Sequence, residues 1–195
     1  MKIHDPAPHD VWHFVIGGFL QDRDEVNGVL RLWDRLSKRA GPHVHVRLLE
    51  WHDDMEEVAQ QVAIVKLLHD APCRVTIDGF SFGGGWGAPR LARALDRRDI
   101  RVSRMNLCDP VYKHPLWLLW LLSLSPWRKI RIPANVDHVD YFLQRNGRPM
   151  GHELVAEGER TTIAPPIFVK GVTHVHMHKL DAWHQRAVAN ARLVA

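Results

Sequence analysis

The most constraining feature of this chain is a serine between an apolar strand and a helix, with a glycine two positions to either side. It lies in the run Gly79-Phe80-Ser81-Phe82-Gly83. Residues 73–78 alternate with β-branched side chains, as a strand does, and residues 88–95 carry apolar side chains at helical spacing. Glycines beside a tight strand-to-helix turn allow strand and helix to approach without a Cβ clash. The pattern therefore predicts that Ser81 lies on a sharp turn and can act as a nucleophile.

The same glycine-rich run has two other interpretations. One is a turn that only packs closely against the sheet. The other is a phosphate-binding loop, which is less well supported because the run lacks the Lys-Ser/Thr pair that ends a P-loop. Its glycines also do not follow the spacing G-x-G-x-x-G.

Strands and amphipathic helices alternate along most of the chain. We predict strands over residues 11–16, 44–49, 73–78, 100–108 and 165–175, and helices over residues 25–39, 53–69, 88–95 and 182–194. The expected buried residues of the second helix are Val58, Val62, Ile64, Val65 and Leu68. This alternation is typical of a mostly parallel sheet with helices on both faces, a three-layer α/β/α sandwich. We predict a single domain over residues 1–195, with a minimal sheet of about five strands and ligands at the carboxyl ends of the strands.

Residues 110–164 interrupt the alternation, and we predict that they form an inserted lid or pocket-wall segment. They contain an apolar run at 115–122, which is too short to span a bilayer. Trp117 and Trp120 of this run, together with Phe80, are the expected lining of an apolar substrate pocket. The alternatives are a buried packing helix and an interfacial helix that makes peripheral membrane contact through its tryptophans.

The composition fits a globular domain and does not indicate nucleic-acid binding. The chain has 195 residues, 46% of them hydrophobic, and a formal charge of +4. Its lysines and arginines are scattered rather than gathered in a basic stripe, so we expect no nucleic-acid partner. Cys73 and Cys108 fit a reducing compartment better than a disulfide framework, and residues 1–10 lack the apolar stretch of a signal peptide. We therefore expect a cytoplasmic protein.

A serine nucleophile needs a base that takes its proton and a group that orients the base. Asp109 directly follows the predicted strand 100–108, where an orienting carboxylate is expected. A turn-forming Asp-Pro pair is the other interpretation of this residue. Asp137 and Asp140, in the inserted segment, are reserve candidates.

Four histidines near the end of the chain are candidates for the base: His174, His176, His178 and His184. The first three alternate at the end of the last predicted strand. If that strand continues, they share one face and their spacing does not separate them. We favour His178, which stands closest to the following helix, and place His176 second. Three imidazoles at this spacing are also compatible with a metal site, although no H-E-x-x-H or paired-cysteine motif supports one.

A third requirement is a pair of backbone N–H groups that bind the developing oxyanion. Phe82, the residue after the serine, is expected to supply one of them. Gly18 or Phe19, in the turn after the first predicted strand, is expected to supply the other. A simple strand-ending turn at residues 17–19 is the alternative.

Together these residues resemble the α/β-hydrolase superfamily, in particular its small lipase-like and esterase-like members. The resemblance rests on G-F-S-F-G at 79–83, the turn at 17–19, Asp109, and the histidines after the last strand. It implies a serine hydrolase that needs no cofactor and cleaves an ester, thioester or similar acyl bond of a small or lipid-like substrate through an acyl-enzyme intermediate. Ser81 would attack and His178, oriented by Asp109, would carry the proton. The sheet has fewer strands than is usual in the superfamily, the acid follows the strand next after the nucleophile's, and residues 110–164 match nothing in the family.

A second hypothesis keeps the fold without the chemistry, because a fold does not fix a function. In this hypothesis the chain is a non-catalytic binding protein. Its apolar segment 115–127 would dock a partner or a membrane.

Overall fold

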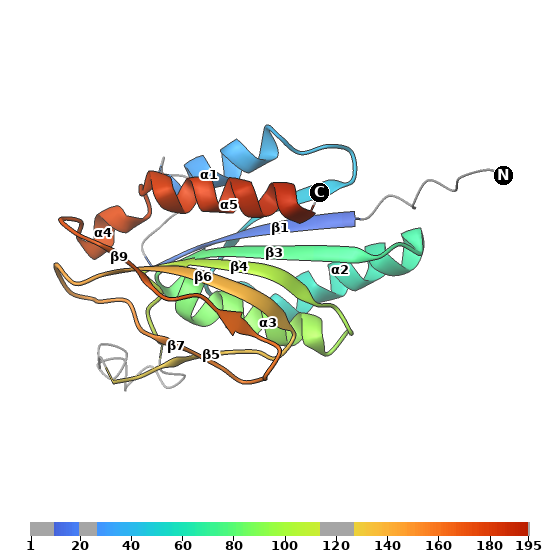
Figure 1. Ribbon diagram of the computed structural model, residues 1–195. Coiled ribbons are helices and arrows are strands. Elements are labelled where there is room, and N and C mark those ends of the chain that lie inside the picture. The colour runs from blue at the N-terminus through green and yellow to red at the C-terminus, as the bar shows by residue number, and fades with distance from the viewer. Residues whose placement is uncertain (1–9, 20–26, 114–126, 195) are drawn as a thin grey trace.

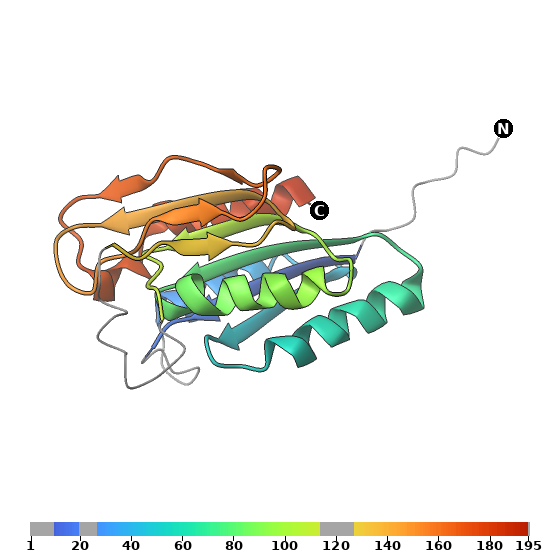
Figure 2. The ribbon, with the colours of Figure 1, turned by 90° about the horizontal axis from the view of Figure 1, so that it is seen from below.

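The structure is a computed structural model that describes residues 10–19, 27–113 and 127–194. A seven-stranded sheet forms its centre, and helices cover both faces of that sheet (Figures 1 and 2). Every pairing in the sheet is parallel, which confirms the predicted three-layer α/β/α fold. The predicted number of about five strands is too low, because the strands over residues 136–144 and 162–163 were not predicted.

The order of the strands in the sheet differs from their order in the chain. The strands are β1 (Asp10–Gly17), β2 (Val44–Glu50), β3 (Cys73–Phe80), β4 (Val102–Cys108), β6 (Val136–Gln144), β8 (Thr162–Ile163) and β9 (Ile167–Val169). They lie in the order β2-β1-β3-β4-β6, and both β8 and β9 pair with β6. Because β2 and β3 lie on opposite sides of β1, the winding reverses between β1 and β3. In open parallel sheets, ligands bind outside the carboxyl ends of the strands at such a point.

Helices lie on both faces of the sheet (Figure 1). One face carries α1 (Gly28–Ser37) and α5 (Asp181–Val194), and the other carries α2 (Met55–His69) and α3 (Ala88–Asp96). Phe14 of β1 packs into one hydrophobic cluster with residues of α2 and α3, whereas its neighbour Val15 packs with residues of α1 and α5. Both are fully buried. This burial on both faces explains why β1 is an almost continuous apolar run.

The second predicted helix is present as α2, and its first turn is capped as its sequence suggests. The side chain of Asp54 accepts hydrogen bonds from the backbone N–H groups of Glu56 and Glu57. Its predicted buried set is partly wrong. Val58 and Val62 are buried, and Val65 packs against the core, but Ile64 is 48% and Leu68 74% exposed. The helix is apolar on more than one face, and the buried face is the one that begins with Met55.

The prediction of one inserted segment over residues 110–164 is wrong for β6, which is part of the main sheet. β6 pairs along β4, with Asn106 opposite Asp140. Charged and polar residues, among them Asp137 and His138, break the apolar pattern by which a buried strand is recognised. Two further strands of this region, β5 (Ile130–Ile132) and β7 (Leu154–Ala156), form a separate two-stranded sheet. Residues 114–126, with Trp117 and Trp120, lie outside the described residues.

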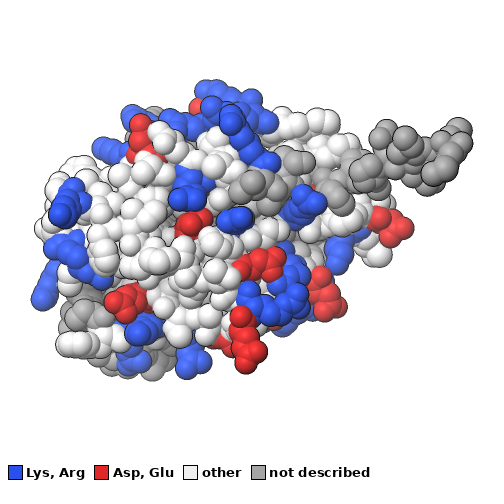
Figure 3. All heavy atoms as spheres, viewed as in Figure 1, with Lys and Arg blue, Asp and Glu red and all other residues white. Residues whose placement is uncertain are grey.

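The predicted last strand over residues 165–175 is also too long. β9 ends at Val169, and residues 174–177 form the short helix α4 (His174–Met177). Within the described ranges no helix is long and apolar enough to cross a bilayer. On the face seen in Figure 3, Lys and Arg side chains are spread over several elements, with Asp and Glu side chains among them.

Candidate active site

The turn after β3 holds Ser81 in a backbone conformation that few residues adopt. Its φ angle is 53°, in the left-handed region, and the π-helical turn η1 (Gly83–Gly87) follows it. A Cβ at Gly79 would lie 2.7 Å from the Cα of Gly84, and a Cβ at Gly83 would lie 2.3 Å from the carbonyl oxygen of Ile16. Both contacts are with backbone, which has little freedom to move away. The two glycines of the motif are therefore needed for the close approach of β3, η1 and β1.

Backbone hydrogen bonds on both sides of Ser81 hold this conformation in place. Its N–H donates to the carbonyl of Cys108 at 3.1 Å. Its own carbonyl accepts from the N–H groups of Gly85 at 2.9 Å and Val111 at 3.0 Å. A non-glycine residue in this region costs about 1–3 kcal/mol and persists only where the surroundings determine it. The hydrogen bonds around Ser81 determine its conformation in this way. The residue follows β3, at the edge of the sheet where the winding reverses.

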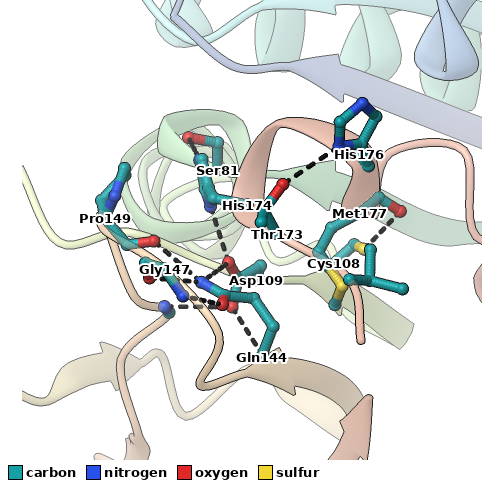
Figure 4. Close-up of polar contacts among 12 residues, drawn as sticks. Ser81, Cys108, Asp109, Gln144, Gly147, Pro149, Thr173, His174, His176 and Met177 are labelled. Atoms are coloured by element: carbon teal, nitrogen blue, oxygen red, sulfur yellow. Dashed lines mark hydrogen bonds and ion pairs between the residues drawn. The ribbon is translucent and has the colours of Figure 1, made fainter. Parts of the chain in front are cut away.

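His174 lies between Ser81 and Asp109, as Figure 4 shows. Its Nε2 is 2.9 Å from Ser81 Oγ, and its Nδ1 is 2.6 Å from Asp109 Oδ2. Because a carboxylate only accepts, Nδ1 carries the proton, and Nε2 is left free to accept from the serine hydroxyl. The ring also stacks on Phe80, with 5.1 Å between ring centroids. A serine, an imidazole and a carboxylate thus form one hydrogen-bonded chain.

Asp109 is fully buried, and every one of its hydrogen-bond partners is a donor. Oδ1 accepts from the backbone N–H groups of Gln144 at 3.1 Å and Gly151 at 3.0 Å. Oδ2 accepts from the side-chain Nε2 of Gln144 at 3.1 Å, in addition to His174. These donors satisfy both oxygens of the buried side chain and fix its orientation toward His174. A Cβ at Gly151 would lie 2.3 Å from Oδ1, so only glycine fits there.

Gln144 ties this carboxylate to the loop that encloses it. Its Nε2 also donates to the carbonyls of Gly147 at 3.0 Å and Pro149 at 2.9 Å. Its Oε1 accepts from the N–H groups of Asn146 at 2.7 Å and Gly147 at 3.0 Å. Gln144 is fully buried at the carboxyl end of β6. The sequence analysis missed it because β6 was not predicted. The available signal was a polar residue directly after the aromatic and aliphatic residues 141–143.

The predicted positions of His178 and His176 beside Ser81 are wrong. His178 Nδ1 accepts from the N–H of Gly28 at 2.8 Å, at the start of α1. Burial, with a smaller contribution from the charge of Lys179, lowers its pKa to about 4. His176 Nδ1 lies 3.0 Å from Thr173 Oγ1.

The error has a simple geometric cause. A strand places alternate residues on one face, whereas the helical turn α4 rotates each residue by about 100° from the last. Only His174, the first residue of α4, faces the serine. The rings of His174, His176 and His178 therefore meet three different partners and do not converge on a metal position. His184 Nε2 donates to the carbonyl of His178 at 3.0 Å.

The two reserve carboxylates lie away from the serine. Asp137 is at the amino end of β6 and pairs with Arg101. Asp140 is buried in the middle of β6, with one oxygen 3.5 Å from His138 Nε2. Only Asp109, among the three predicted candidates, reaches the histidine that contacts Ser81.

The residues predicted for the oxyanion site are next to Ser81. A Cβ at Gly18 would lie 2.6 Å from the Cβ of Ser81, and Phe82 begins the turn into η1. The ring of Phe19 is 6.0 Å from that of Phe82. The use of their N–H groups to bind an oxyanion stays a prediction. Phe80, which we expected in the pocket lining, is instead buried beneath His174.

Comparison with known proteins gives similarity only at the level of solved structures. No family model matches the chain. No curated protein sequence matches it. The structure of RedJ with a polyethylene glycol molecule in its active site has 12% sequence identity and a TM-score of 0.48, over 99% of this chain and 93% of that one.

Two further structures are thioesterases by description. RedJ thioesterase from the prodiginine biosynthetic pathway of Streptomyces coelicolor has 10% identity and a TM-score of 0.46, over 96% of this chain and 87% of that one. The Vlm2 thioesterase domain, bound with a dodecadepsipeptide, has 15% identity and a TM-score of 0.43, over 97% and 96% of the two chains. We draw no functional argument from similarity at this level.

The fold and the site share one arrangement with a known class of fold. A parallel sheet carries a serine on a strained turn after β3, an aspartate after β4 and a histidine after β9. The chain order Ser, Asp, His on such a sheet is that of the α/β-hydrolase fold, which this chain resembles in that order.

Proposed function

We propose that the protein is a serine hydrolase that cleaves an ester, thioester or similar acyl bond with Ser81, His174 and Asp109. One observation carries the proposal. Ser81, in the left-handed conformation, is 2.9 Å from His174 Nε2, and the other nitrogen of that ring is 2.6 Å from a buried carboxylate. A nucleophile, a base and an orienting group within hydrogen-bond reach are what acyl transfer requires.

The proposed reaction uses the side chains of the chain and one water molecule. Ser81 Oγ attacks the acyl carbon while His174 Nε2 takes the hydroxyl proton. The resulting imidazolium stays beside the Asp109 carboxylate, which lowers its free energy, and then gives the proton to the leaving group as the acyl bond breaks. A water molecule then attacks the acyl-enzyme and loses a proton to the same nitrogen. Transfer of that proton to Ser81 Oγ releases the acid and restores the site.

The proposal includes an oxyanion site beside the serine. The backbone N–H of Phe82, with that of Gly18 or Phe19, would bind the oxygen of the tetrahedral intermediate. The support is their position, since Phe82 follows Ser81 and Gly18 packs against it. Donors fixed in advance at such a place lower the barrier by several kcal/mol in other acyl transferases.

The proposed substrate is a small acyl ester or thioester with an apolar acyl group. Carboxylic esters, including lipid-like ones, are the first to test. We also propose a cytoplasmic location, for which the free thiols of Cys73 and Cys108 are the support.

The test is labelling with a fluorophosphonate probe, followed by peptide mapping. We expect labelling of Ser81 in the wild-type protein, none in Ser81→Ala, and little in His174→Gln. His176→Gln is the matched control, because that exposed ring lies on the same short helix and its Nδ1 lies 3.0 Å from Thr173 Oγ1 rather than beside Ser81. It should label like the wild type.

Each outcome has a clear meaning. No labelling of a protein shown to be folded by circular dichroism would refute the proposal and favour the non-catalytic binding protein. Equal labelling of His174→Gln and His176→Gln would refute the assignment of the base. For esters that are cleaved, Ser81→Ala should lower kcat/KM by about 10⁴-fold or more.

A further inference from the structure

Four aromatic side chains form a surface beside the turn that holds Ser81. They are Phe19 after β1, Trp51 after β2, and Phe82 and Trp86 at the start and within η1; we call them the aromatic rim. Ring centroids are 6.0 Å apart for Phe19 and Phe82, 6.3 Å for Phe19 and Trp51, and 5.6 Å for Trp51 and Phe82. Phe19 is 58% exposed, so its ring is open to solvent beside the buried serine.

The aromatic rim is attached to the serine on two sides. Phe82 is the next residue after Ser81, and Phe19 follows Gly18, whose Cα packs against the Ser81 side chain. A substrate whose carbonyl carbon lies at Ser81 Oγ is therefore within reach of these rings. The apolar part of such a substrate can pack on the aromatic rim.

Two cations are held on the outer part of the aromatic rim. Lys113 Nζ lies 5.2 Å from the ring centroid of Trp51 and 5.0 Å from that of Trp86. The Cζ of Arg90 lies 5.7 Å from the same Trp86 ring. Both distances are within the range of cation–π attraction, which fixes the position of a charge without neutralising it.

The ammonium group of Lys113 keeps the capacity to bind an anion. It has three N–H donors, and an indole face attracts its charge but gives these donors no lone pair. In the described part of the chain, no carboxylate forms an ion pair with Lys113 or Arg90. Two cations next to an aromatic surface thus lie on the side of the turn that holds Ser81.

From this arrangement we propose that the substrate carries an anionic group, a carboxylate or a phosphate, which binds to Lys113 while its apolar part covers the aromatic rim. The inference rests on the proposed hydrolase function and specifies its substrate class. It assigns Lys113 as a specificity-determining residue. The anionic group can belong to the acyl chain of the substrate or to its leaving group. In either case the charge lies within reach of the aromatic rim.

Two pairs of esters separate these sources of charge. For the acyl side, 4-nitrophenyl octanoate is compared with the mono-4-nitrophenyl ester of suberic acid, which has the same chain length and a terminal carboxylate. For the leaving group, the methyl 4-hydroxybenzoate ester of octanoic acid is compared with the 4-hydroxybenzoic acid ester. We expect kcat/KM to be about tenfold higher for the charged member of one pair, the size of one hydrogen bond to a charged group.

The variant Lys113→Met tests whether this preference depends on Lys113. Methionine keeps an apolar stem on the two indoles and removes the charge. The ratio of kcat/KM for the charged ester to kcat/KM for the neutral ester should therefore fall to about one. Lys113→Arg should retain the preference. The control is Lys38→Met, the same change on α1, where the lysine pairs with Asp34 at 2.6 Å; it should keep the preference.

A binding measurement separates failure of this inference from failure of the proposed function. Calorimetry on Ser81→Ala should show tighter binding of the charged ester than of the neutral one, and the difference should vanish in Ser81→Ala/Lys113→Met. This result would support the anion site even if no ester is hydrolysed. Hydrolysis or binding that is indifferent to the anionic group, or a preference that Lys113→Met leaves unchanged, would overturn the inference and leave the catalytic proposal intact.

Discussion

Replacing Asp109 with asparagine keeps the size of the side chain and removes its charge and one of its two acceptor oxygens. In the structure the carboxylate accepts from four donors, two on each oxygen. If the asparagine oxygen takes the place of Oδ1, it keeps the N–H groups of Gln144 and Gly151. Its NH₂ group then faces two other donors, Gln144 Nε2 and His174 Nδ1.

Neither of those two groups adapts without loss. Gln144 does not turn its carbonyl toward the asparagine, because Oε1 already accepts from the N–H groups of Asn146 and Gly147. His174 can accept at Nδ1 only if its proton moves to Nε2, and Nε2 then no longer accepts the proton of Ser81.

The expected magnitudes follow from these losses. The wrong tautomer lowers kcat by about 10⁴-fold when the equivalent substitution is made in a serine protease triad, and we expect a similar loss here. Opposed or unpaired buried donors cost about 1–3 kcal/mol, which should appear as a lower free energy of unfolding.

The assay is hydrolysis of a 4-nitrophenyl ester, with urea unfolding measured on the same preparation. Asp137→Asn is the control, because Asp137 pairs with Arg101 away from the serine, and it should hydrolyse the ester at the wild-type rate. A folded Asp109→Asn variant with activity within tenfold of the wild type would refute the reasoning that Asp109 fixes the tautomer of His174.

Three further predictions concern stability. Gly83→Ala places a methyl group 2.3 Å from the carbonyl oxygen of Ile16, so the free energy of unfolding in urea should fall by about 1–3 kcal/mol; an unchanged value would contradict the close approach. Burial lowers the pKa of His178 to about 4, below its unfolded value near 6.5, so the folded state binds fewer protons and stability should decline as the pH falls from about 6.5 to 4. Urea unfolding across that range should show a smaller decline for His178→Gln. Burial raises the pKa of Asp78 to about 7, above its unfolded value near 4, so the folded state binds more protons and stability should decline as the pH rises from about 4 to 7. Asp78→Asn keeps an acceptor for Asn106 and should be more stable than the wild type at pH 8, and a less stable variant would contradict this.

Much of the fold was predictable because its signals are local. The alternation of apolar runs with helical spacing predicted β1 to β4 and their helices, since burial on both faces of a parallel sheet imposes an apolar run on each strand. The exception, β6, contains Asp137, His138 and Asp140 within one strand. Periodicity alone does not identify these residues as a strand. Pairing with β4 holds them in the sheet all the same.

The turn at Ser81 was predictable for a related reason. The glycines at 79 and 83 are required by backbone atoms that approach the turn closely, so their spacing is visible in the sequence. Asp109 was likewise predicted from its place directly after a strand. In each case a few adjacent residues carry the whole signal.

The sequence by itself therefore determined the layered α/β architecture, the turn at Ser81 and the position of Asp109 at the end of a strand. Each of these depends on residues that are neighbours in the chain. Only the tertiary structure decided which histidine meets them and what holds the aspartate. His174 is 93 residues from Ser81 and 65 from Asp109, and Gln144 is 35 residues from Asp109. Whether residues 174–177 form a strand or a helical turn decides which ring points at the serine, and that local choice depends on packing against the rest of the chain. Contacts over such separations leave no periodic pattern, because they are fixed by where the strands end in space and not by the order of the residues.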